Sequence, residues 1–183
     1  EFTQVDMELS FVEEDDVMEF NEGLIAHVFK EVAGVDVKLP IKRMTYKDAM
    51  EKYGSDKPDL RFGMEITDIT ADVKDMDFVV FKSAIEAGGS VRGLCLKGGA
   101  DLGRKPLDKL GEFVKTYKAK GLAWIQFKED GIKSSISKFL TDEVTESIKE
   151  TMNAENGDAV LIVADKNSVV FQSLGALRLH LAK

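Results

Sequence analysis

The sequence predicts an α+β fold in which helices pack on one face of a mixed or antiparallel sheet. The prediction has three grounds. Short apolar runs, typical of strands, occur at residues 65–69, 90–96, 121–128 and 158–165. Longer amphipathic segments, typical of helices, occur at about 78–87, 105–119, 141–153 and 167–182. Glu129-Asp130-Gly131 has the composition of a hairpin turn.

Two of the predicted helices carry a clear apolar stripe. Residues three and four apart share one face of a helix, so a stripe at that spacing marks the side that packs against a sheet. On the helix at 105–119 the stripe is Leu107, Leu110, Phe113, Val114 and Tyr117, and on the helix at 167–182 it is Val170, Leu174, Leu177 and Leu181.

A different pattern occupies the first 63 residues. Residues 2–11 alternate with period two, which predicts a strand, and a helix should follow it from Asp15 and Asp16 to a stop at Gly34. A shorter helix should begin at Thr45. Residues 53–63 are rich in breakers and charges, so they should form a loop. We place the domain boundary after this loop, with one domain at 1–63 and a second at 64–183.

The composition limits the possible classes of protein. Of the 183 residues, 44% are hydrophobic and 32% charged, an ordinary globular balance, and no apolar run approaches the roughly 18 residues of a membrane span. The net charge of −8 argues against a free-standing nucleic-acid binder, although Lys115, Lys118 and Lys120 are a candidate basic patch. A single cysteine, Cys95, excludes an internal disulfide and fits a reducing cytoplasm. Because the chain lacks an initiator Met, we expect it to have been cut from something longer.

Motifs for catalysis or metal binding are scarce. His27 and His180 lie far apart on predicted helices and have no metal-ligand spacing, so we expect no metal site. Gly98 and Gly103 resemble the glycines of a P-loop, but Arg104 stands where the motif needs a lysine, and Lys105 stands where it needs a serine or threonine. A flexible turn is the better interpretation. Cys95 is expected to be a buried, unreactive packing residue.

The polar face of the first predicted strand is unusual. It carries Phe2, Gln4, Asp6, Glu8 and Ser10, whereas the opposite face carries Thr3, Val5, Met7, Leu9 and Phe11. A phenylalanine can stack on a base, an amide offers a donor and an acceptor, and a carboxylate can bind an ammonium group or Mg²⁺. From composition alone, an ordinary edge-strand face is the stronger interpretation.

Several segments resemble one known family. Residues 1–8 resemble the second strand of motif 2 of class II aminoacyl-tRNA synthetases in its aspartyl form, and residues 43–50 and 53–63 resemble a signature of the bacterial aspartyl enzymes. Residues 118–124 and 174–178 resemble the GAD domain inserted in those enzymes. The resemblance spans nearly the whole chain and implies a DCoH-like insertion at 64–183, whose last helix returns to the core, and a partial class II catalytic core at 1–63.

The resemblance also implies a function. The parent enzyme would activate aspartate with ATP and Mg²⁺, transfer it to tRNA, and act as a cytoplasmic homodimer without membrane attachment. Phe2 would stack on adenine, Gln4 would lie near the nucleotide, and Asp6 near the aspartate. No complete catalytic set lies within the chain, because the arginine and acid of motif 2 and all of motif 3 should lie outside it. The isolated chain should therefore be an inactive monomer without cofactors, acting as a structural or tRNA-proximal module.

Three questions remain open at this stage. The chain could instead belong to a tRNA-dependent amidotransferase subunit, which also carries a GAD domain, or be a general protein-interaction module. Lys57 and Arg61 could contact tRNA, although pairing with the neighbouring Asp56 and Asp59 is the stronger alternative. Residues 1–12, an edge strand without its sheet, should either pair artificially or fray.

Overall fold

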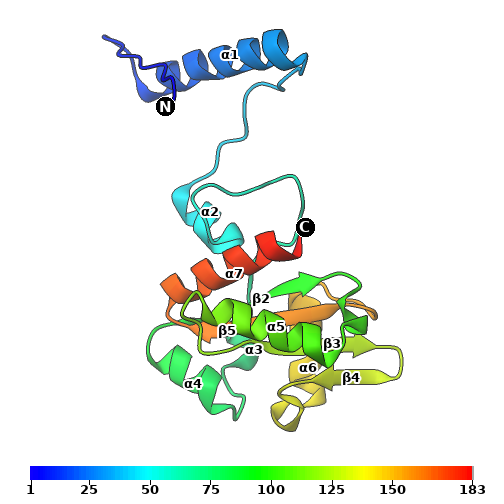
Figure 1. Ribbon diagram of the computed structural model, residues 1–183. Helices are drawn as coiled ribbons and strands as arrows, with labels where there is room; N and C mark the ends of the chain where they lie inside the picture. Colours follow the sequence, from blue (N-terminus) through cyan, green and yellow to red (C-terminus); the bar gives the residue numbers. More distant parts are fainter. Residues whose placement is uncertain (183) are drawn as a thin grey trace. The chain divides into compact units, whose positions relative to one another are not determined.

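The computed structural model describes residues 1–182 and divides into two compact units. The smaller unit is Glu1–Met44, and the larger unit begins at Thr45 (Figure 1). The packing therefore groups residues 45–63 with the sheet. The predicted boundary between residues 63 and 64, which separates the partial catalytic core from the GAD insertion, stays a prediction. No helix within residues 1–182 has the length and apolarity needed to cross a membrane.

The smaller unit is built around one long helix, α1 (Glu14–Ala33). Asp16 accepts a hydrogen bond from the Glu13 backbone N–H at 2.9 Å, and this closes a capping box at the first turn. Gly34 ends the helix with a φ of 66°, a left-handed conformation that favours glycine. The predicted stop at Gly34 is confirmed, whereas the N-cap is Glu13 rather than Asp15 or Asp16, and Asp16 takes part as the third residue of the capping box. No residue of α1 is buried within the unit.

The strand predicted at residues 2–11 is absent, and this prediction was wrong. Residues 1–13 form neither helix nor strand. A strand is stabilised by backbone hydrogen bonds to a neighbouring strand, and the described residues of the smaller unit contain no other strand to supply them. Alternation of polar and apolar residues prepares a segment for a sheet but does not provide the partner.

The larger unit contains a five-stranded antiparallel sheet in the order β1-β2-β5-β3-β4. The α+β class and the antiparallel option are therefore confirmed. Its helices and strands, in chain order, are α2 (Tyr46–Tyr53), β1 (Thr67–Asp68), α3 (Thr70–Val73), α4 (Val79–Glu86), β2 (Ser90–Leu96), the 3₁₀ helix η1 (Gly99–Asp101), α5 (Arg104–Lys115), β3 (Ala123–Lys128), β4 (Gly131–Ser134), η2 (Ser137–Phe139), α6 (Asp142–Thr151), β5 (Ala159–Asp165) and α7 (Asn167–Leu181). The predicted turn at residues 129–131 joins β3 to β4 as a hairpin.

Helices cover both faces of the sheet, so the prediction of one covered face was wrong. Along the central strand β5, Val160, Ile162 and Ala164 belong to one apolar core, and Leu161 and Val163 to another. Successive side chains of a strand point to opposite faces, so these are two cores on opposite sides. The first core is completed by side chains of α3, α4 and α6, and the second by α5 and α7. A strand with both faces apolar must be covered twice.

Candidate functional site

The helix α2 reaches α7 through a close backbone contact. A Cβ atom added to Gly175 would lie 2.8 Å from the Tyr53 carbonyl oxygen, and one added to Gly54 would lie 2.1 Å from the Phe171 carbonyl oxygen. Gly54 also ends α2 with a φ of 67°. Only glycine fits at both places, so the two helices meet where neither carries a side chain. At the other end of α2, Thr45 accepts a hydrogen bond from the Asp48 N–H, as predicted.

One buried arginine holds the loop that follows α2. Arg178, on α7, is 1% exposed. Its Nε donates to the Met64 carbonyl at 3.0 Å, and its Nη2 donates to the carbonyls of Asp59, Phe62 and Gly63 at 2.8, 2.9 and 2.9 Å. The buried charge is stabilised by hydrogen bonds to oriented carbonyl dipoles, and no carboxylate accepts a hydrogen bond from it. The loop at residues 54–64 is therefore wrapped around a fixed cation.

Aromatic rings complete the arginine's surroundings. The guanidinium carbon lies 4.1 Å from the ring centre of Phe62 and 4.8 Å from that of Tyr53, which are cation–π distances. Burial lowers the pKa of Arg178 from its ordinary value and raises that of Tyr53, whose hydroxyl donates to Glu65 at 2.8 Å. The guanidinium nevertheless stays charged at neutral pH, because an arginine side chain is not deprotonated inside a protein. We call this set of residues, Tyr53, residues 54–64 and Arg178, the Arg178-anchored loop.

The outer side of the Arg178-anchored loop carries exposed cations. Arg61 contacts the Asp59 carboxylate through Nη2 at 2.6 Å and Nε at 3.0 Å, and its side chain is 89% exposed. The Arg61 guanidinium holds the pKa of Asp59 down at about 2. The stronger alternative from the sequence, ion pairing, is thus confirmed for Arg61 with Asp59 but is not observed for Lys57 within residues 1–182. Lys57 is exposed and makes no ion pair within residues 1–182; only its backbone N–H is used, donating to Ser55 Oγ at 3.0 Å.

This geometry suits binding rather than bond chemistry. The loop contains no cysteine or histidine, and its one serine, Ser55, has its hydroxyl engaged by the Lys57 backbone N–H. No described residues group three His, Cys, Asp or Glu side chains around a possible metal position. Arg61 donates to Asp59 through Nε and Nη2, and its Nη1 makes no hydrogen bond within residues 1–182. The residue lines an open hollow together with Leu179 and Ala182. An exposed lysine and a partly engaged arginine on a rigid loop can bind an anion such as a phosphate.

Comparison with known proteins identifies the larger unit. The model of the GAD domain family matches residues 81–174, slightly more than half of the chain. The chain belongs to the GAD domain family. The match runs from α4 into α7, and both the Arg178-anchored loop and Arg178 itself lie outside it.

Individual relatives match the chain over its whole length. It is 89% identical over 183 residues to the aspartate–tRNA ligase of Clostridium botulinum strain Eklund 17B, 87% identical to that of Clostridium beijerinckii, and 70% identical to that of Clostridium perfringens strain 13. In each case the chain spans 31% of the relative's length. The similarity therefore includes residues 1–80, which precede the GAD domain match.

The three residues proposed for substrate binding lie in the smaller unit. Phe2 is 85% exposed, and Gln4 and Asp6 are also exposed. Within residues 1–182 none of the three is placed by a neighbouring strand. Lys57 and Arg61 belong to the other unit, the one with the GAD domain. The assignment of substrate roles to Phe2, Gln4 and Asp6 thus continues to rest on resemblance.

In the P-loop-like segment at residues 98–103, the backbone N–H of Gly98 binds the carboxylate of Asp158. Asp158 accepts from the Gly98 N–H at 3.0 Å, from Lys97 Nζ at 2.8 Å and from the Glu155 N–H at 2.8 Å. It is 5% exposed, and contacts with Lys97 and the two amides outweigh burial to lower its pKa. The backbone amide that a phosphate would need is occupied. The interpretation of Gly98 as a turn residue is supported by its φ of 70°.

Cys95 and the histidines have packing or surface positions. The Cys95 Sγ lies 3.8 Å from an Asp158 oxygen, and the pKa of the thiol is raised to about 11, chiefly by burial. Half-buried rather than fully buried, the thiol stays protonated at neutral pH, in line with the predicted unreactive role. His27 is exposed on α1. His180, exposed on α7, stacks on Phe113 of α5 with ring centres 4.5 Å apart.

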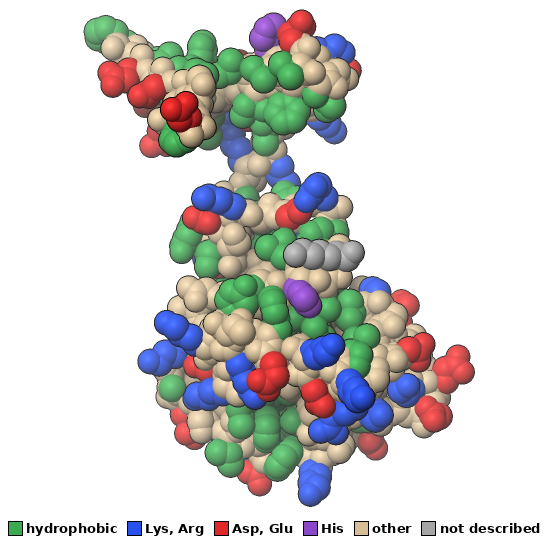
Figure 2. All heavy atoms as spheres, in the orientation of Figure 1, with side chains coloured by type: hydrophobic (Ala, Val, Ile, Leu, Met, Phe, Trp, Pro, Cys, Tyr) green, Lys and Arg blue, Asp and Glu red, His purple; other side chains and the backbone are tan. Residues whose placement is uncertain are grey.

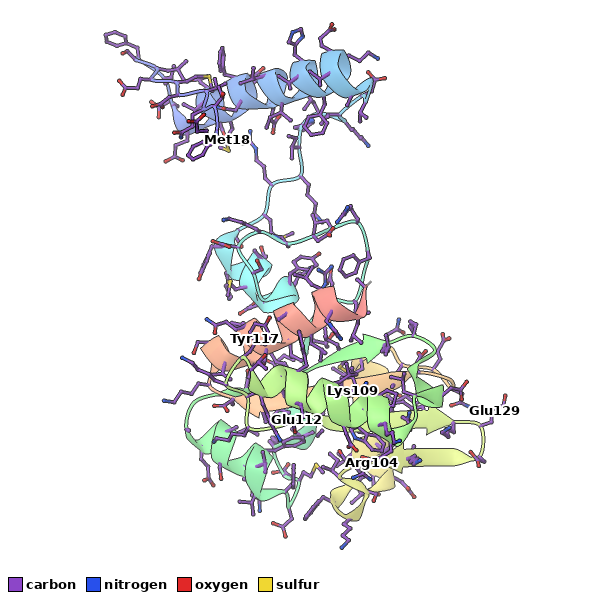
Figure 3. The ribbon with its side chains drawn as sticks, viewed as in Figure 1. Met18, Arg104, Lys109, Glu112, Tyr117 and Glu129 are labelled. Atoms are coloured by element: carbon purple, nitrogen blue, oxygen red, sulfur yellow. The ribbon has the colours of Figure 1, made fainter. Side chains whose placement is uncertain are left out.

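The suggested basic patch is only partly paired with acids. Lys115 pairs with Glu112 at 2.7 Å, whereas Lys118 and Lys120 are exposed and make no ion pair within residues 1–182. Arg104, at the start of α5, pairs with Asp108 at 3.0 Å. Arg104, Lys109, Glu112 and Tyr117 follow one another along the side of α5 and the turn after it (Figure 3). On the face of the GAD domain seen in Figure 2, basic and acidic side chains alternate without one sign dominating. Such a surface provides little net attraction for a phosphate backbone.

Sequence reasoning missed Arg178 and Asp158 as structural centres. A usable signal existed for Arg178, which stands four residues after Leu174 and next to Leu177 on the apolar stripe of α7. A charged residue on a buried stripe needs partners, and backbone carbonyls of a breaker-rich loop are the natural supply. No comparable signal marks Asp158, because two of its three partners, Lys97 and Gly98, are distant in sequence.

Proposed function

We propose that this chain is part of an aspartate–tRNA ligase, in which the GAD domain is an insertion beside the catalytic core. The observation that carries the proposal is the 89% identity to aspartate–tRNA ligases over all 183 residues. An amidotransferase subunit is less well supported, because the similarity to the ligases includes residues 1–63 as well as the GAD domain. The whole enzyme would join aspartate to tRNA with ATP and Mg²⁺, in the form of a homodimer.

Transfer of aspartate to tRNA tests this proposal. The longer protein that contains this chain should attach labelled aspartate to tRNA in a reaction that needs ATP and stops when Mg²⁺ is chelated. The same protein should not attach labelled asparagine, glutamate or lysine. Charging with one of those amino acids and not with aspartate would contradict the proposal.

Within that enzyme, we propose that Phe2, Gln4 and Asp6 form one edge of the substrate site. In a complete sheet the alternation of residues 2–11 would place these three side chains on one face. Phe2 would stack on the adenine ring, Gln4 would bond the nucleotide, and Asp6 would pair with the ammonium group of aspartate. The chemistry at the α-phosphate would be stabilised by cations from elsewhere in the protein.

Substitution of Asp6 tests its role. A hydrogen bond to a charged group contributes roughly 1.5–3 kcal/mol, so Asp6→Asn in the longer protein should raise the KM for aspartate by roughly ten-fold or more. The KM for ATP should change little. Glu8→Gln, two residues along the same face, is the matched control and should leave both constants within about two-fold. An unchanged KM for aspartate in the Asp6 variant would remove Asp6 from the site.

For the Arg178-anchored loop, we propose a contact with tRNA phosphates through Lys57 and Arg61. The support is geometric: both side chains are exposed, and the loop that carries them is fixed from behind by four hydrogen bonds from Arg178. A fixed cation loses less entropy on binding than one on a mobile loop. The Asp59 carboxylate keeps the guanidinium of Arg61 oriented without using all its donors.

Salt dependence of tRNA binding distinguishes this contact from simple surface pairing. Each phosphate contact contributes close to one unit to the slope of log affinity against log salt concentration. Lys57→Ala with Arg61→Ala in the longer protein should lower the slope by about 1 to 2. The control pair Lys115→Ala with Arg104→Ala, on α5, should leave it unchanged. An unchanged slope in the Lys57/Arg61 variant would refute the contact.

A further inference from the structure

A small apolar cavity lies on the α4 side of the sheet, in the GAD domain. Its volume is about 180 Å³. It is lined by Phe78, Val80, Phe81, Lys120, Gly121, Leu122, Ala123, Ile162 and Ala164. The lining thus combines α4, the segment before β3, and the two strands β3 and β5. None of these residues takes part in the Arg178-anchored loop.

The cavity exists because β3 is shorter than β5 at this end. Ala123 pairs with Ile162 as the last rung between the two strands, whereas β5 continues to Asp165. Beyond that rung the sheet face is covered by the loop at 120–122 and by small side chains at Ala123 and Ala164. Phe78 and Phe81, in edge-to-face contact with ring centres 4.8 Å apart, form a rigid wall on the α4 side.

The interior is apolar and its deepest residues are inaccessible. Phe81 and Ile162 are each 1% exposed. Val80 is 43% exposed, so this residue stands nearer the opening. Among the lining residues the only charged side chain is that of Lys120, which is exposed and makes no ion pair within residues 1–182. The cavity therefore has an apolar interior and one cationic side chain in its lining.

Size and charge together define the ligand that fits. Apolar cavities of about 150 Å³ in proteins stay dry and accept a benzene-sized molecule. A cation at an otherwise apolar site favours an anionic group on the ligand and disfavours a second cation. We propose that this cavity binds a small carboxylic acid with one ring or a branched aliphatic body, with its carboxylate paired to Lys120. The ring or branched body would lie against Phe81 and Ile162.

This inference is independent of the proposed ligase activity, because it concerns the GAD domain alone. Apart from Lys120, the lining holds no polar side chain that could act as a nucleophile or general base, so we assign it as a binding site and not as a second reaction centre. The contribution of Lys120 should be modest, since ion pairs at exposed positions are weak. Most of the affinity should come from the apolar body.

Titration of the 183-residue chain with benzoate tests the proposal. With methyl groups labelled for NMR, benzoate should shift the methyl signals of Ile162, Ala164 and Val80 with millimolar affinity. Benzyl alcohol, a neutral molecule of the same size, should bind the same methyls roughly two to five times more weakly. Benzylammonium should bind more weakly still.

Three variants separate the apolar and charged parts of the site. Ala123→Leu should fill the cavity and abolish the shifts. Lys120→Gln should remove the preference for benzoate over benzyl alcohol, and Lys118→Gln, outside the lining, should keep it. Lys120 is exposed, so its variant tests the charge even if Ala123→Leu does not fold. Two results would overturn the proposal. One is the absence of methyl shifts with benzoate at concentrations up to about 20 mM, and the other is equal affinity for benzoate and benzyl alcohol.

Discussion

Replacing Arg178 by methionine removes the cation around which the loop at 54–64 is wrapped. Methionine has a similar length and is apolar, so it keeps much of the packing volume on α7. Four carbonyl oxygens, those of residues 59, 62, 63 and 64, lose their N–H donors. The cation–π contacts with Tyr53 and Phe62 disappear as well.

The size of the effect follows from these contacts. Hydrogen bonds to a charged group contribute roughly 1.5–3 kcal/mol each, and an orphaned buried acceptor costs roughly 1–3 kcal/mol. The sum is offset in two ways. The cost of burying a guanidinium is recovered, and the loop carbonyls can turn to water because Gly63 and its neighbours lie near the surface. We expect a net loss of about 3 kcal/mol in the free energy of unfolding, comparable to breaking a buried ion pair.

Fluorescence of the single tryptophan measures this loss of stability, because the tryptophan lies in the larger structural unit. Trp124 is 6% exposed in β3, so its signal reports unfolding of the larger unit alone. Urea titration should give a lower midpoint for Arg178→Met with little change in slope. Arg178→Lys, which keeps the charge but not the planar set of donors, should lie between Arg178→Met and the wild type. Arg104→Met, at a side chain 76% exposed on α5, should change stability by less than about 0.5 kcal/mol.

Hydrogen exchange supplies the local readout. Amides at residues 57–64 should exchange much faster in Arg178→Met, whereas amides of β5 should keep most of their protection. Equal stability of Arg178→Met and wild type, together with unchanged exchange in the loop, would refute the role of this arginine as the loop's anchor.

Three further predictions follow from particular contacts. Gly175→Ala should destabilise the larger unit by about 1–3 kcal/mol, because its Cβ would lie 2.8 Å from a backbone carbonyl of α2. Gly111→Ala, with no atom within 4 Å of the added Cβ, should stabilise it by about 0.5–1 kcal/mol. Urea titration measures both free energies of unfolding, and equal effects would contradict the close contact. The pKa of Asp59 should be near 2 by NMR titration and should rise toward 3.8 in Arg61→Gln. Because the folded-state pKa is lowered, the stabilising contribution of this pair is complete above about pH 4 and disappears as the pH falls toward 2. An unshifted pKa of Asp59 in the wild type would contradict the pairing. Cys95, with a thiol pKa of about 11, should react slowly with a disulfide reagent at pH 7.5 and quickly in urea, and fast labelling of the folded chain would contradict its half-buried position.

Regular elements with strong local patterns could be predicted from the sequence. Four of the five α-helices and four of the five strands in the 64–183 region could be located because their apolar residues repeat at helical or strand spacing, whereas β4 was indicated only by the turn before it. Gly34 predicts the end of α1, because a left-handed cap favours glycine. Thr45 predicts the start of α2, because a threonine hydroxyl can accept a hydrogen bond from an N–H of the first turn. The one-turn helix α3 (Thr70–Val73) is too short to show a period and was not found.

Helix ends without a sequence signal were misplaced. The helix predicted at 105–119 ends at Lys115. The chain turns at Lys118 with a φ of 72°, a left-handed conformation in a residue that gives no warning of it. Tyr117, four residues after Phe113, continues the apolar spacing past the true end of the helix, and the ring centres of these two residues lie 5.4 Å apart.

Features that depend on distant partners were not recoverable from local pattern. The alternation at residues 2–11 was read correctly as a pattern but wrongly as a strand, since the structure supplies no neighbouring strand. For the two-sided sheet, a signal was present and undervalued. Residues 159–164 contain no polar side chain, so both faces of β5 needed a helical cover.

The candidate site divides in the same way. Lys57 and Arg61 could be singled out because a breaker-rich loop with cations is visible in sequence. Their fixation by Arg178 could not, because it joins residues more than a hundred positions apart. Substrate roles for Phe2, Gln4 and Asp6 came from resemblance, and the single chain does not assemble the sheet in which those roles would operate.

Aspartate-dependent exchange of pyrophosphate with ATP tests the central claim most directly. The assay compares this 183-residue chain with the longer protein that contains it, with each amino acid supplied separately. We predict exchange in the longer protein with aspartate alone, and no exchange in the 183-residue chain. Exchange by the 183-residue chain would contradict the view that its catalytic groups are incomplete, and absence of aspartate-dependent exchange in the longer protein would contradict its assignment as an aspartate–tRNA ligase.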